Sequence, residues 1–141
     1  MGARRTTGRR QSRALTPWHD AVRSADIARV KALLASGANV NALDERGQTA
    51  LINAVIWGNV EIARLLIQRG AELNHTAALR LTALYLAVIR KRPDFVKILV
   101  EAGADARIKG STDQYDCTPL EYAQRYGYAE SVEILKKAPS P

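Results

Sequence analysis

The apolar residues of this chain recur at the spacing of an α-helix, and the pattern repeats along the sequence. Two consecutive stretches place apolar residues at positions i, i+3 and i+4, namely Ile62, Leu65 and Leu66, and then Phe95, Ile98 and Leu99. Residues at this spacing lie on one face of a helix and form a buried stripe. Gly37, Gly70 and Gly103 follow such stretches and are spaced 33 residues apart. Because glycine adopts the left-handed backbone conformation at little cost, we expect each glycine to end a helix.

A threonine marks the start of an earlier helix in each unit. Thr16, Thr49 and Thr82 are also 33 residues apart, and Thr118 follows after 36 residues. A threonine side chain accepts a hydrogen bond from a free N–H of the first helical turn, so each threonine is a predicted N-cap. An alanine lies five residues beyond every one of these threonines, where its small side chain lets neighbouring helices approach closely.

A second helix is predicted in each unit after a tight turn. These helices begin near Asp26, Asn59, Pro93 and Tyr128. We expect the side chains of Asp26 and Asn59 to cap their helices. Two short amphipathic helices cannot enclose a core, so neighbouring units must stack. The sequence therefore predicts an all-α solenoid of four helix-turn-helix repeats with connecting β-turn loops, at about residues 14–43, 44–76, 77–109 and 113–138. The loop before the fourth repeat carries three extra residues, around Gly110.

The motifs of these units resemble those of the ankyrin-repeat family. Residues 47–51, Gly-Gln-Thr-Ala-Leu, and residues 70–74, Gly-Ala-Glu-Leu-Asn, fit the start and the end of one repeat. Residues 16–19, Thr-Pro-Trp-His, resemble the family's Thr-Pro-Leu-His signature. The third repeat departs from the family pattern, with Arg80 where a turn glycine is usual and Lys-Arg-Pro at residues 91–93 where Gly-His is usual. The resemblance covers about residues 14–138, and it implies an ankyrin-type solenoid whose first helices and connecting loops bind other proteins.

Applied to this chain, the resemblance implies a partner-binding surface with contributions from every repeat. The candidate residues are Arg23, Arg46, Gln48, Ile56, Trp57, Leu81, Ile89, Arg90, Tyr115, Arg125 and Tyr126. Tryptophan, tyrosine and arginine are the residue types enriched at interaction hot spots. Because other apolar residues already fill the interior positions, we expect Trp57 and Ile89 to be exposed rather than packed against neighbouring repeats. The expected partner is another protein with acidic and apolar segments, bound by a monomeric scaffold or inhibitor.

The net charge of +7 is concentrated at one end of the chain. Five arginines and no acidic residue lie in residues 1–13, whereas the remaining residues contain 16 basic and 14 acidic side chains and so carry +2. This distribution predicts a basic, disordered arm at residues 1–13, a folded domain at 14–138 and a short tail at 139–141. Binding of nucleic acid by the folded part is not indicated. Attachment of the arm to nucleic acid or to an anionic membrane is the alternative function, and Gly2 with Thr6 also fits an acylation pattern.

The sequence contains no constellation of residues that suggests catalysis. Cys117 has no histidine near it in the sequence, and we expect it to be an ordinary loop residue. His19 is expected to bond the backbone of its own turn, as the family's signature histidine does. No spacing of histidines, cysteines or acids matches a metal site, and no glycine-rich phosphate loop occurs. We therefore expect no enzyme activity, no cofactor, no metal and no small-molecule substrate. A single cysteine and the lack of a long apolar run favour a soluble, cytoplasmic protein.

Overall fold

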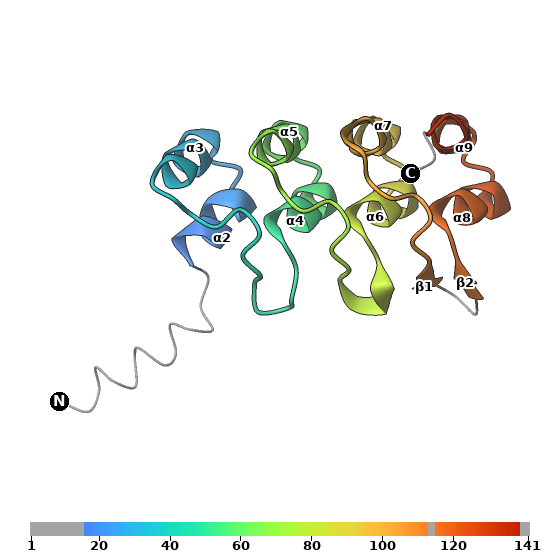
Figure 1. The fold of residues 1–141 in the computed structure, drawn as a ribbon, viewed down its shortest axis with the longest axis horizontal. Coiled ribbons are helices and arrows are strands. Elements are labelled where there is room, and N and C mark those ends of the chain that lie inside the picture. Colours follow the sequence, from blue (N-terminus) through green and yellow to red (C-terminus); the bar gives the residue numbers. More distant parts are fainter. Residues whose placement is uncertain (1–15, 113–114, 139–141) are drawn as a thin grey trace, which may run out of the picture.

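The computed structural model describes residues 16–112 and 115–138, and it shows helices arranged in two layers (Figure 1). The inner helices are α2 (Pro17–Arg23), α4 (Ala50–Trp57), α6 (Ala83–Ile89) and α8 (Pro119–Tyr126). The outer helices are α3 (Ile27–Ala35), α5 (Val60–Gln68), α7 (Pro93–Ala102) and α9 (Ala129–Lys136). The loops that connect successive pairs project beyond the inner layer, on the side opposite the outer helices. The predicted stack of four helix pairs is confirmed. The predicted arm at residues 1–13 and tail at 139–141 lie outside the described residues.

Each marker threonine caps an inner helix, as predicted. The Oγ1 atoms of Thr49 and Thr82 accept hydrogen bonds of 3.2 and 3.1 Å from the backbone N–H groups of Ile52 and Tyr85. Thr16 makes the equivalent bond. Thr118 forms a reciprocal capping box, because the Glu121 side chain also accepts from the Thr118 N–H at 2.8 Å. The caps satisfy N–H groups that would otherwise lack a partner at the start of each helix.

The outer helices begin in a different way. Asp26 caps α3 by accepting from the Arg29 N–H at 3.1 Å, but the predicted cap at Asn59 is wrong, since its side chain makes no capping bond. The tight turn before each outer helix is held by the backbone, because the residue at the cap donates its N–H to the buried alanine of the inner helix. For Asn59 this bond reaches the Ala54 carbonyl oxygen at 2.8 Å. The turn is closed without the asparagine side chain.

The residue before each outer helix cap adopts a left-handed backbone conformation. In two repeats this residue is glycine, with φ 76° at Gly58 and 72° at Gly127, but Ala25 and Lys91 take φ 58° and 56° at the equivalent positions. Gly58 has a further reason to be glycine, because a Cβ atom there would lie 2.8 Å from Nη1 of Arg92. Arg92, which belongs to the Lys-Arg-Pro segment that departs from the family pattern, thus lies against the turn of the preceding repeat.

The core is continuous along the stack. Its largest fully buried side chains come from both layers and include Leu51, Ile52, Ile62, Leu66, Leu84, Tyr85, Phe95 and Leu99. The four alanines that follow the threonines, Ala21, Ala54, Ala87 and Ala123, are completely buried. Because these positions hold only a methyl group, the inner helices can lie close together.

The extended fourth loop forms a β-hairpin, which the all-α prediction did not include. Strand β1 (Gly110–Thr112) pairs antiparallel with β2 (Tyr115–Cys117), and Gly110 lies opposite Cys117. Gly110 is required here, since a Cβ atom would come within 2.6 Å of Leu81 Cδ2. The expectation that Cys117 is an ordinary loop residue is also wrong. Its thiol is buried in β2 and shares a 2.9 Å hydrogen bond with the hydroxyl of the fully buried Tyr85.

We predict that Ala25→Gly stabilises the protein by about 0.5–1 kcal/mol. A left-handed alanine costs about 1–2 kcal/mol, and the extra chain entropy of unfolded glycine offsets part of this gain. Urea unfolding followed by circular dichroism measures the change. The matched variant Gly58→Ala should be less stable than wild type by about 1–2 kcal/mol, because it adds the same backbone strain and displaces Arg92. A loss of stability in Ala25→Gly would contradict the left-handed turn.

Candidate protein-binding surface

Equivalent positions near the end of each inner helix form a row across the stack. The positions seven and eight residues beyond the marker threonines hold Arg23 and Ser24, Ile56 and Trp57, Ile89 and Arg90, and Arg125 and Tyr126. We call these eight residues the contact row. Ile56 and Ile89 are half-buried, and the other six are exposed. Because the repeats stack side by side, equivalent side chains of neighbouring repeats lie next to one another.

The contact row borders the loops. Nη2 of Arg23 in α2 lies 3.8 Å from Oε1 of Glu45 in the loop that follows the first repeat. One turn earlier in α4, Nδ2 of Asn53 donates to Oδ2 of Asp44 in the same loop at 3.0 Å. The row and the loops therefore form two sides of one continuous surface, as the family resemblance implies.

Trp57 is the most exposed large apolar residue in the contact row. It is 57% exposed at the end of α4, which agrees with the expectation that it does not pack against a neighbouring repeat. Tyr126 is 45% exposed at the equivalent position of α8. Ile89 differs from its expectation, because it packs partly against the small cluster of Leu81, Tyr85 and Cys117. The geometry of the row thus exposes two aromatic side chains, with exposed Arg90 between them.

Leu81 is buried and does not belong to the expected surface. Leu81 is only 9% exposed, because the hairpin of the fourth loop covers it. The exposed apolar side chain of the third loop is instead Leu79, which is 62% exposed within the 3-10 turn η1 (Ala78–Arg80). Tyr115 begins β2, but its side chain is outside the described part of the molecule. Arg80, which stands where the family pattern has a turn glycine, pairs through its guanidinium with Asp116 of β2 at 2.6 Å.

Comparison with known families agrees with this geometry. Residues 19–67 match the model described as Ankyrin repeats (many copies), and residues 75–140 match the model described as Ankyrin repeats (3 copies). The chain belongs to the ankyrin-repeat family. Ankyrin repeats are in general protein–protein interaction modules and are typically not catalytic. A search of curated proteins found no match to the chain.

The ankyrin stack contains one position of the surface that the sequence analysis missed. Four residues beyond the marker threonines, the inner helices carry Asp20, Asn53, Leu86 and Tyr122. These side chains are half-buried and lie one turn before the contact row. Leu86 and Tyr122 add apolar surface to the third and fourth repeats. Their 33- and 36-residue spacings could have revealed them, had the repeat been followed through every position of the inner helix.

A cluster of tyrosines ends the contact row. The ring of Tyr122 lies 4.6 Å from that of Tyr126 and 5.6 Å from that of Tyr85, measured between centroids. Tyr128 lies 6.1 Å from Tyr126, and Nζ of Lys91 is 5.3 Å from the centroid of the Tyr128 ring. Tilted aromatic pairs and cation–π contacts of this kind hold rings in place. The contacts with Tyr122 and Tyr128 therefore restrict the exposed ring of Tyr126, which lowers the conformational entropy that this ring would lose in an interface.

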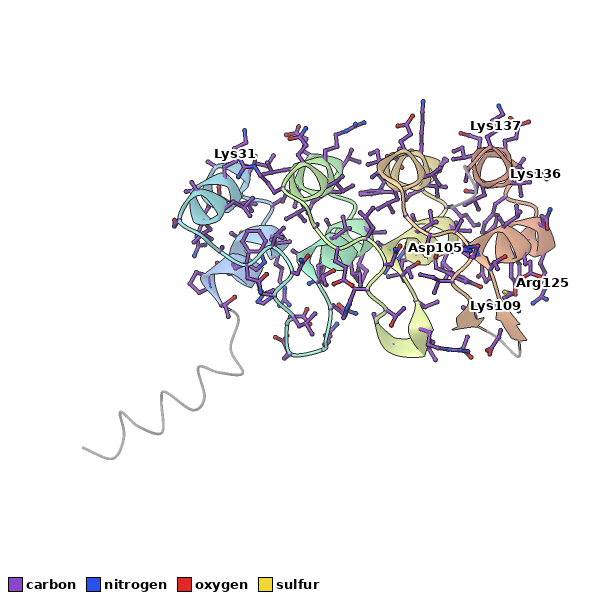
Figure 2. All side chains as sticks on the ribbon, viewed as in Figure 1. Lys31, Asp105, Lys109, Arg125, Lys136 and Lys137 are labelled. Atoms are coloured by element: carbon purple, nitrogen blue, oxygen red, sulfur yellow. The ribbon has the colours of Figure 1, made fainter. Side chains whose placement is uncertain are left out.

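Positive charge accompanies the aromatic residues. Figure 2 shows Arg125 projecting from α8 and Lys109 from the segment that leads into the hairpin. Arg90 is exposed, and within residues 16–112 and 115–138 no carboxylate lies within ion-pair distance of it. An acidic group on a partner would therefore meet Arg90 without displacing an existing ion pair.

The loop between the first and second repeats is held by the ionised carboxylate of Asp44. Partial burial opposes ionisation of Asp44, but hydrogen bonds from Asn53 and from the N–H groups of Gln48 and Arg46 outweigh it and lower the pKa of Asp44. These bonds are 2.8–3.0 Å long. They fix the backbone of Arg46 and Gln48, two of the expected contact residues. The Arg46 side chain is exposed and Gln48 is half-buried.

The buried side chains of His19 and Tyr85 are engaged in hydrogen bonds within the stack. The Thr16 hydroxyl donates to Nδ1 of His19 at 2.7 Å, and Nε2–H of His19 donates to the Ala42 carbonyl oxygen at 3.3 Å, so both ring nitrogens have partners. The ring thus differs from its expectation, because it bonds the side chain of Thr16 in its own turn and the backbone of the following loop at Ala42. Burial and the hydrogen bond with Cys117 raise the pKa of Tyr85, which keeps its hydroxyl protonated. Among the described residues, no group of three or more histidines, cysteines or acids could hold a metal ion.

A hollow lies away from the contact row. It has a volume of about 580 Å³ between the outer helices α7 and α9, where charged side chains such as Lys97 and Glu133 surround Val100 and Ile134. It contains neither a histidine nor a cysteine. Within the described chain, no helix is long and apolar enough to cross a membrane.

We predict that Asp44 contributes to the pH dependence of stability. Because its pKa is lower in the folded state, its contribution is present above the unfolded pKa of about 3.9 and is lost as the pH falls through the lower, folded value. The difference between the urea midpoints of wild type and Asp44→Asn should be largest near pH 6 and smaller near pH 3, where the contribution of the Asp44 charge is being lost. An equal difference at both pH values would show that the charge of Asp44 has no such role.

Proposed function

We propose that this ankyrin stack is a non-catalytic interaction protein that binds a partner protein through the contact row and the adjoining loops. The partner's docking segment carries apolar and acidic side chains. Binding makes the chain a scaffold or an inhibitor, depending on which partner surface is occupied. The cytoplasmic location and monomeric state expected from the sequence belong to the same proposal.

The exposed ring of Trp57 is the observation that carries this proposal. A tryptophan buries about 150–250 Å² in all, so covering its exposed 57% removes roughly 90–140 Å² from water. At about 25 cal/mol/Å² this contributes roughly 2–3.5 kcal/mol before the costs of ordering the partner. Trp57 therefore supports an interface at the centre of the row.

Arg90 and Tyr126 extend the same surface toward the fourth repeat. Arg90, which pairs with no carboxylate among the described residues, provides positive charge in the repeat next to Trp57. Tyr126 provides a second aromatic side chain in contact with Tyr122. Residues of these three types are the common anchors of protein interfaces. An acidic and apolar segment is complementary to this sequence of side chains.

We predict that Trp57→Ala and Arg90→Glu each reduce capture of the partner from native lysate at least about tenfold, corresponding to about 1.4 kcal/mol. Lys97→Glu is the matched control, because it reverses an exposed charge on the outer helix α7. Circular dichroism of each variant checks that the stack is folded. Undiminished capture by both folded variants would contradict the proposal.

The alternative function places binding in the N-terminal segment. Five arginines without an acidic neighbour in residues 1–13 favour attachment to nucleic acid or to an anionic membrane, with the repeats as cargo. Such binding depends on ion release and weakens steeply with salt.

We predict that partner capture persists at about 200 mM salt and in a variant lacking residues 1–13. Binding to DNA or to vesicles with anionic lipid, measured beside it, provides the comparison. Loss of partner capture in the truncated variant, together with collapse of binding between about 50 and 200 mM salt, would favour the alternative.

A further inference from the structure

The position eight residues beyond each marker threonine presents a regular series of side chains. In chain order the series is Ser24, Trp57, Arg90 and Tyr126. One side chain comes from each successive inner helix, and packed helices are about 8–10 Å apart. A small polar residue is thus followed by an aromatic, a cationic and a second aromatic residue, one from each inner helix. This series restricts the conformation and the sequence of the bound segment, an inference that rests on the proposed function.

The row offers side chains but no open backbone edge. Trp57 and Tyr126 lie in the last turns of α4 and α8, where the N–H groups of Gly58 and Gly127 are bonded to carbonyl oxygens of the same helix, so no strand edge is available. A bound segment that crosses these helices therefore receives few hydrogen bonds for its own backbone. A β-strand would leave its peptide groups unpaired along the row. Its side chains also alternate between faces, so residues three apart could not both point at the row.

A polyproline II helix satisfies both requirements. Its backbone is solvated and needs no hydrogen-bond partner, and every third residue returns to the same face after about 9.3 Å. This interval falls within the expected spacing of the inner helices. Residues i, i+3 and i+6 of such a segment would meet Trp57, Arg90 and Tyr126 in turn. Proline-rich segments characteristically dock in grooves lined with aromatic side chains.

Charge selects the central residue of the segment. Arg90 lies between the two aromatic positions and is exposed, without an ion-pair partner among the described residues. Nearby positive charge comes from Lys91, which lies over the Tyr128 ring. We propose that the contact row binds a proline-rich segment in the polyproline II conformation, with proline or another apolar residue at i and i+6 and an acidic residue at i+3.

Blocked synthetic heptapeptides test the proposal on the full chain. The matched peptide is Pro-Pro-Pro-Glu-Pro-Pro-Pro. One control moves the glutamate by one position, a second replaces it with lysine, and a third replaces the prolines with alanine, which removes the rings that fix the polyproline II backbone. Heteronuclear NMR follows the two indole N–H signals, which the Trp57→Phe variant assigns. Trp18 is buried in α2 and provides the internal reference.

The matched peptide should shift the Trp57 signal and leave that of Trp18 unchanged. The displaced-glutamate and alanine peptides should bind at least about tenfold more weakly, and the lysine peptide should bind wild type more weakly still. In folded Arg90→Glu the preference should reverse, so that the lysine peptide binds better than the glutamate peptide. This exchange would not occur if Arg90 acted only on the fold.

Three results would overturn the proposal. They are equal binding of the proline and alanine peptides, no effect of moving the glutamate, and absence of any shift at Trp57. Equal binding of the alanine peptide would show that a preformed polyproline II backbone is not what the contact row selects. If Trp57→Ala still abolished capture of the natural partner while no peptide bound, the proposed function would stand and this inference alone would fail.

Discussion

Two short helices cannot enclose an apolar interior, so each repeat of this protein buries its residues against its neighbours. The four fully buried alanines, Ala21, Ala54, Ala87 and Ala123, lie where the inner helices must come close. Leu51, Leu84 and Phe95 complete an interior that runs along the stack. Because stacking is repeated in one direction, every position of the repeat becomes a row in space. The contact row is a direct consequence of this constraint.

The same constraint separates the roles of the two helical layers. Backbone bonds hold the turns between the layers, so the exposed side chains of the contact row are not needed to close them. Trp57 and Arg90 lie outside the interior, so these positions are open to selection for binding independently of folding. This is why an exposed tryptophan in the row supports a binding role more strongly than a large residue in the outer layer would.

The fourth repeat modifies the surface through its longer loop. Three additional residues allow a hairpin that covers Leu81 and is joined to the inner layer by the hydroxyl of Tyr85, which contacts Cys117 at 2.9 Å and Thr112 at 3.3 Å. The Arg80–Asp116 pair ties the hairpin to the preceding loop, but both side chains are more than half exposed, so its contribution to stability is small. The hairpin and the tyrosine cluster make this end of the row the more apolar and better supported one.

Local chemistry within the sequence determined the repeat, its helix starts and its ends. Thr49 caps a helix, Gly70 ends one and Ala54 permits close packing because of properties that each residue carries with it. The outward position of Trp57 also followed from the period, since the interior positions of its helix were already occupied. Tertiary structure decided the features that depend on which backbone or side chain lies opposite. Leu81 and Cys117 became buried because a hairpin folded over them. Such outcomes depend on contacts between residues far apart in the chain, which a one-dimensional pattern does not contain.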